Sequence, residues 1–259
     1  MMMVSDQVDD IFPVDQVADE AKNDRTLKVQ LSGTAVVSEV KLNNVVSAAD
    51  ARVPVRIKKT VQVKMVNCQY GIPRFKGSCW SDDDVRSTKE ALKQRYAQVG
   101  IQLEISVVQG PDIGLGRDIS EYPNLNGNQM NIPEETTDIF DAAPASNPDE
   151  IVLYLIGYLS GPAAPSGCAT PEKFLSEAQR SAGYANKALV ASPSVAGDLF
   201  TASHELLHVL LDAEHDDYKT EFDDAQMLWS KTRYNATIND TKRITITQET
   251  KILASPFAK

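Results

Sequence analysis

All three histidines of this 259-residue chain lie in one short segment, His204-Glu205-Leu206-Leu207-His208-Val209-Leu210-Leu211-Asp212-Ala213-Glu214-His215. Two histidines four apart on a helix project from one face within reach of a single ion, and neutral imidazole suits zinc. Glu205, next to the first histidine, is placed to meet a water on that metal. The spacing predicts a zinc site with Glu205 as the catalytic residue.

The chemistry expected of such a site is hydrolysis. Zinc lowers the pKa of a bound water from about 15.7 towards about 7 and polarises a carbonyl. Glu205 can accept the proton as general base and pass it to the leaving amine, so the reaction needs no Ser or Cys nucleophile. We expect an enzyme, a zinc metalloendopeptidase that cuts protein or peptide substrates with a metal-activated water.

A catalytic zinc takes three protein ligands plus water, so a third ligand is needed. On a straight helix His208 and His215 would lie about 10 Å apart, at a rise of about 1.5 Å per residue. Ligands that each sit about 2 Å from the metal cannot be so far apart. The helix must therefore end near Leu211 and the chain must turn back. We favour His215 as the third ligand, and Glu214 and Glu221 remain the carboxylate alternatives.

The segment resembles the metzincin family of zinc peptidases, whose signature is HExxHxxGxxH followed by a turn containing methionine. Leu211 stands where the family has its turn-making Gly, and six residues rather than five separate His208 from His215. Glu214 thus occupies the family's third-ligand position. Asp212 tolerates a left-handed backbone better than Leu does, so one inserted residue can restore the reversal.

Downstream residues extend the resemblance. Met227, twelve residues beyond His215, looks like the family's methionine turn, which implies a structural, non-ligating floor beneath the metal. Thr245 and Gln248 form a capping-box pattern that opens a short helix through Leu253, similar to the family's closing helix. The resemblance covers residues 52–255. It implies an α+β fold: a metzincin-like mixed twisted sheet with an active-site helix and a smaller C-terminal subdomain.

Hydrophobic periodicity predicts the elements that must position this site. They are strands over 27–31 and 61–66, a helix over 83–99, strands over 101–108, 151–156 and 188–191, and a helix that starts near Leu199 and carries the histidines. In the family an edge strand before the metal helix pairs with extended substrate, which implies that role for residues 188–190 by β-augmentation. Residues 109–150, rich in Gly, Pro, Asn and Asp, are expected to form a long loop.

The N-terminal part of the sequence suggests the domain organisation. Residues 1–26 are acidic with little apolar periodicity, as expected of a loosely attached leader. We therefore predict an N-terminal extension over residues 1–50, partly disordered or β, and a catalytic domain over 51–259.

Composition excludes some partners. The chain has 26 Lys plus Arg against 36 Asp plus Glu, a net charge of -10 that repels nucleic acid and anionic lipid. The acidic start lacks the basic residues and apolar core of a secretory signal, and no apolar run is long enough to span a bilayer. We expect a soluble monomer that binds neither nucleic acid nor membrane, in a compartment that the sequence leaves open.

The three cysteines are too few and too scattered for a Cys-rich metal site. Cys68 and Cys79 are the natural pair for a single disulfide, and free buried thiols are the equal alternative. A rival to the enzyme reading also stays open. In it, zinc stabilises a non-catalytic binding or structural protein through a closed four-ligand site, and Glu205 is dispensable.

Overall fold

The computed structural model describes residues 10–13, 26–31, 36–41, 52–55, 57–72, 75–113, 118–160, 164–193, 200–214 and 244–259. The predicted ligand His215, its alternative Glu221 and the predicted turn residue Met227 lie outside these ranges. So does the predicted leader, except for Thr26 and for strand β1 (Asp10–Pro13), which pairs with β4 (Arg52–Val55). Strands β2 (Thr26–Leu31) and β3 (Val36–Lys41) form a second antiparallel pair.

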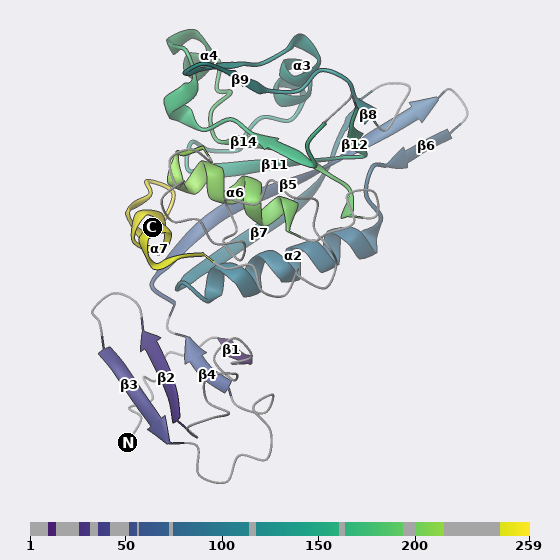
Figure 1. The fold of residues 1–259 in the computed structure, drawn as a ribbon. Helices are drawn as coiled ribbons and strands as arrows, with labels where there is room; N and C mark the ends of the chain where they lie inside the picture. Colours follow the sequence, from purple (N-terminus) through teal and green to yellow (C-terminus); the bar gives the residue numbers. More distant parts are fainter. Residues whose placement is uncertain are drawn as a thin grey trace.

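A mixed, twisted six-stranded sheet forms the centre of the fold (Figure 1). Its path is β13-β14-β11-β5-β6, and β7 lies on the other side of β5. β11 is parallel to β14 and β5, and β7 is parallel to β5, whereas β13 and β6 run antiparallel to their neighbours. The strands are β5 (Lys59–Ile72), β6 (Phe75–Ser78), β7 (Ile101–Asp112), β11 (Glu150–Ile156), β13 (Gly167–Ala169) and β14 (Lys187–Ala191).

Helices lie on both faces of this sheet. α2 (Asp82–Ala97) and α6 (Thr201–Leu211) cover one face, with α7 (Ile246–Ala254) beside α6 (Figure 1). α3 (Glu134–Ala142) and the short α4 (Glu177–Ser181) lie on the opposite side. The connecting elements are β8 (Asp118–Ile119), β9 (Asn124–Asn126), β10 (Gln129–Asn131), β12 (Tyr158–Leu159) and the 3-10 turn η2 (Glu172–Phe174).

The predicted elements of the α+β fold are confirmed, and local chemistry explains their ends. α2 begins after Ser81, whose side chain accepts from the Asp84 N–H at 3.1 Å, and three acidic residues in its first turn suit the positive end of the helix dipole. Gly100, at a φ of 76°, follows the helix. α7 opens with the predicted capping box, in which the Thr245 and Gln248 side chains each accept from the other's backbone N–H.

The prediction for the edge of the sheet was wrong. β14, over the predicted 188–190, lies between β11 and β13, and all five of its residues are buried. A continuous apolar run is typical of a strand that is covered on both faces and has a neighbour on each side. β14 is such a strand. Within the described residues β13 pairs with β14 alone, so β13 is the edge strand.

The prediction of a loop over residues 109–150 was also wrong, because short elements occupy much of it. One carboxylate of α3 holds the turn after β8: Glu135 Oε2 accepts from the backbone N–H groups of Ser120 (3.1 Å) and Glu121 (2.8 Å). The Thr136 hydroxyl donates to the Glu121 carbonyl at 3.0 Å. Such side-chain to backbone bonds satisfy turn groups that helices and strands do not.

All three cysteines are free, so of the two options for Cys68 and Cys79 the structure has buried thiols. The two residues are cross-strand neighbours, since the Cys79 N–H donates to the Cys68 carbonyl at 2.8 Å. Among the described residues, no helix is both long and apolar enough to cross a membrane.

Candidate metal centre

α6 carries His204, Glu205 and His208 and is packed tightly against the rest of the fold. Leu206, Leu207 and most other side chains of the helix are buried. From α2, the fully buried Tyr96 hydroxyl donates to the Ser203 carbonyl at 2.9 Å, one residue before the first histidine. The histidine-bearing face is therefore held by both apolar packing and a buried hydrogen bond.

The two histidine rings converge. His204 Nε2 and His208 Nε2 are 3.1 Å apart, and the rings meet edge to face at 77°. Two nitrogens bound to one tetrahedral zinc at about 2.0–2.1 Å would be separated by about 3.3 Å. The distance fits two ligands of one zinc ion. Without a cation the same contact is an N–H···N hydrogen bond. The geometry is therefore compatible with a pair of ligands on one metal ion and also with a direct hydrogen bond between the rings.

A backbone carbonyl orients the second histidine. His208 Nδ1 lies 2.7 Å from the Ala213 carbonyl oxygen, which can only accept. Nδ1 therefore carries the proton, and the lone pair of His208 is on Nε2, facing His204. This second interaction of a ligand's other ring nitrogen is usual in zinc sites, where it fixes the tautomer and the ring direction.

The predicted end of the helix is confirmed. α6 stops at Leu211, and Asp212 has the left-handed conformation, with φ 46° and ψ 52°. The Ala213 N–H then donates to the His208 carbonyl at 3.1 Å, so the chain reverses immediately after the helix. Asp212 thus supplies the reversal for which Gly is the usual residue, as its tolerance of this conformation predicted.

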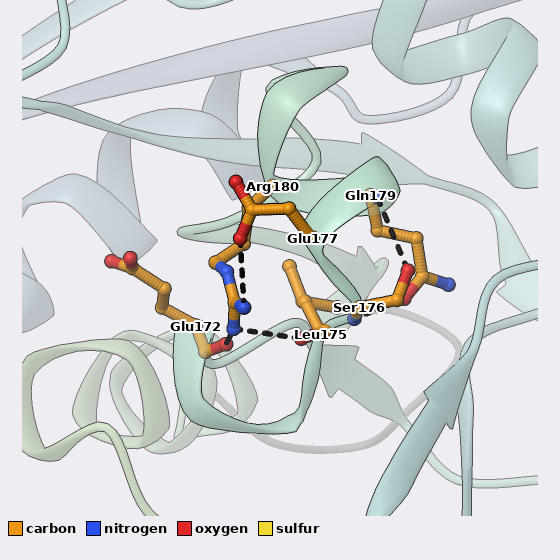
Figure 2. Close-up of polar contacts among 6 residues, drawn as sticks. All are labelled: Glu172, Leu175, Ser176, Glu177, Gln179 and Arg180. Carbon is orange, nitrogen blue, oxygen red and sulfur yellow. Dashed lines mark hydrogen bonds and ion pairs between the residues drawn. The ribbon is translucent and has the colours of Figure 1, made fainter.

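Asp212 is also held from the segment that joins β13 to β14. Its Oδ1 accepts from the Lys173 backbone N–H at 2.9 Å. Figure 2 shows how that segment is stabilised: Arg180 donates to the Leu175 carbonyl at 2.8 Å and pairs with Glu177 at 3.1 Å. Ser176 and Gln179 form a second capping box there. The turn after α6 and the connection after β13 therefore support each other.

Glu205 is buried, with 4% of its surface exposed, and it lies against β13. A Cβ built on Gly167 would be 2.7 Å from Glu205 Cγ and 2.8 Å from Oε1, so the carboxylate lies over this strand. The next residue, Cys168, has a thiol whose pKa is raised well above its usual value, mainly by burial and then by the Glu205 and Glu214 carboxylates. Both carboxylates are thus close to the edge strand.

Of the candidate third ligands, Glu214 lies within the described residues. Within them no three His, Cys, Asp or Glu side chains cluster as metal ligands, so Glu214 does not complete such a group with the two histidines. His215 and Glu221 lie outside the described residues.

Sequence reasoning missed two residues near this site, Gly167 and Ala213. A glycine inside a strand often marks the close approach of another group, which was the available signal for Gly167. The carbonyl of Ala213 gives no sequence signal because every residue has one.

A scan against models of known protein families found none that matches the chain, and a search of curated proteins found no match.

Proposed function

We propose that this chain is a zinc metalloendopeptidase with a metzincin-like catalytic fold, an active-site helix and a smaller C-terminal subdomain. His204, His208 and His215 would hold the metal, and Glu205 would act as general base on protein or peptide substrates. The order of strands and helices before α6 agrees with this proposal. So does the buried position of the helix.

The observation that carries the proposal is the 3.1 Å approach of His204 Nε2 and His208 Nε2, together with the Ala213 carbonyl on the other nitrogen of His208. A helix does not need two imidazole nitrogens facing each other for packing alone. A backbone acceptor that leaves the lone pair on the inner nitrogen is what a metal ligand requires. Because the chain reverses at Asp212, the proposal does not need α6 to continue as far as His215.

Zinc, when bound, would supply an activated water and polarise the scissile carbonyl. Glu205 is adjacent to His204 on the same helix, and its carboxylate lies beside β13. From there it would take a proton from the attacking water and deliver it to the leaving amine. Its burial limits competition from bulk water and strengthens its electrostatic interactions with the reacting atoms.

The edge strand β13 offers a place for extended substrate. Among the described residues only β14 pairs with β13, and the Glu205 carboxylate lies against this strand. A peptide added to its open edge would gain main-chain hydrogen bonds and pass close to the general base. The role expected for residues 188–190 therefore moves to residues 167–169.

The proposal is tested by metal content and casein cleavage of the wild-type chain. We expect one zinc per chain, loss of cleavage when 1,10-phenanthroline removes the metal, and recovery when zinc is returned. His215→Ala should lose zinc and activity, whereas Glu214→Gln should keep both. The reverse pattern would move the third ligand to Glu214, and a chain that binds no zinc would contradict the proposal. One zinc in a protein that cleaves nothing would favour the non-catalytic binding or structural protein.

A further inference from the structure

Gly167 lies where two elements of the site meet. It is buried in β13, opposite Val190 of β14, and faces α6. A Cβ at this position would lie 2.7 Å from Glu205 Cγ, 2.8 Å from Glu205 Oε1 and 2.8 Å from Thr201 Cγ2. Real Cβ atoms essentially never approach other heavy atoms closer than 3.0 Å. Even the smallest side chain would therefore overlap the general base.

Backbone conformation does not explain this glycine. The described glycines with positive φ are Gly100, Gly127 and Gly183. Gly167 is an extended strand residue in a conformation that any residue adopts. The position therefore requires glycine for space, and the atoms that fill the space belong chiefly to Glu205.

We propose that Gly167 is a positioning residue for Glu205: the missing side chain leaves the volume in which the carboxylate is held against β13. The inference rests on the proposed peptidase function for its catalytic consequence, although the packing relation stands without it.

Of the groups around this contact, we expect the Glu205 side chain to move, because β13 and α6 are both held in place. β13 is fixed on both sides of Gly167, because the Ala191 N–H donates to the Ser166 carbonyl and the Thr170 N–H donates to the Lys187 carbonyl, both at 2.8 Å. α6 is fixed by its buried apolar face and by the bond from Tyr96. A methyl group at position 167 would thus rotate the carboxylate away before it moved either element.

The first variant is Gly167→Ala, with Gly77→Ala as the control. Gly77 is also a strand glycine, and the atoms nearest to its added Cβ would belong to the phenol of Tyr70, at 3.1 Å or more. A misplacement of a catalytic group by about 1 Å costs up to about 100-fold in rate. We expect Gly167→Ala to lower kcat by about 10- to 100-fold with KM within about twofold and zinc content unchanged. Gly77→Ala should keep the wild-type kcat.

The second arm needs no activity. In the metal-free protein, Gly167→Ala should lower the melting temperature, and it should lower it by much less in a Glu205→Ala background, which lacks the Glu205 atoms that would clash. If Gly167→Ala alone does not fold, Gly167→Ala with Thr201→Ser relieves the Thr201 contact and leaves the contact with Glu205.

The outcomes separate the two proposals. A reduced kcat with zinc retained, together with a smaller loss of melting temperature in the Glu205→Ala background, supports the inference. Wild-type kcat in Gly167→Ala, or losses in melting temperature that simply add, would overturn it. An inactive wild type would overturn the peptidase function, and the stability cycle would still decide whether Gly167 sets the position of Glu205.

Discussion

Lys187 of β14 is buried in the sheet and contacts α3. Only 3% of its surface is exposed. Its Nζ donates to the Tyr154 hydroxyl at 3.3 Å and to the Phe140 carbonyl at 3.4 Å, and it lies over both aromatic rings. Burial lowers its pKa from 10.5 to about 8, and the nearby Asp141 carboxylate only partly opposes this.

The direction of the stability change follows from these pKa values. Between about pH 8 and 10.5 the unfolded chain keeps the proton on Lys187 and the folded chain releases it. The stability contribution of this lysine therefore rises with pH across that window. At pH 7 both states are protonated, and burial of the charge costs about 3 kcal/mol at about 1.4 kcal/mol for each pH unit of difference. At pH 9.5 the remaining cost is about 1 kcal/mol.

Lys187→Met keeps an unbranched side chain, shorter by one heavy atom, and removes the charge. The variant loses two hydrogen bonds and the cation–π contacts, together about 1–2 kcal/mol. We expect a net gain in stability of about 1–2 kcal/mol at pH 7 that disappears or reverses at pH 9.5, because the wild type alone gains as its lysine deprotonates.

Urea unfolding at the two pH values, with EDTA present throughout, measures this difference. Lys93→Met is the control for the substitution itself, because Lys93 is an exposed lysine of α2. If the difference in the free energy of unfolding between Lys187→Met and wild type stays constant between pH 7 and pH 9.5, the reasoning is refuted.

Two further predictions concern the helix that carries the histidines. Asp212→Val should lower stability by about 2–3 kcal/mol in thermal unfolding, because a β-branched residue resists the left-handed conformation and the bond from Lys173 is lost. Asp212→Asn should stay within about 0.5 kcal/mol of wild type. Equal losses in both variants would contradict the role of this turn. Tyr96→Phe should cost about 0.5–1.5 kcal/mol in urea unfolding because the bond from Tyr96 to the Ser203 carbonyl is lost, while zinc content stays the same. Unchanged stability would mean that the bond does not fix α6.

The end of α6 was predictable because a distance constraint on the predicted zinc ligands demanded it. A third ligand beyond His208 required a chain reversal, and Asp212 was the residue near Leu211 best suited to a left-handed turn. The structure has that turn. By contrast, the acceptor on His208 is the carbonyl of Ala213, which depends only on where the reversed chain lies and leaves no trace in residue type.

The edge of the sheet was not predictable from periodicity. β13 has only three residues, Gly167–Ala169, too few to show alternation, and its place is set by pairing with β14. α3 was missed for a related reason. Among the nine residues of this helix, Ile139 and Phe140 are the only large apolar side chains, so the polar first turn resembles the Asn- and Pro-rich sequence that precedes it.

The central claim is that Glu205 performs the chemistry at a zinc site held by His204 and His208. The most direct test compares casein cleavage by wild type and Glu205→Gln at equal, measured zinc content, since Gln keeps the shape of the side chain and cannot accept the proton. We expect the variant to keep its zinc and to lose about 10²- to 10⁴-fold in rate, the usual contribution of a general base. Cleavage by Glu205→Gln at the wild-type rate, with zinc bound in both proteins, would contradict the account.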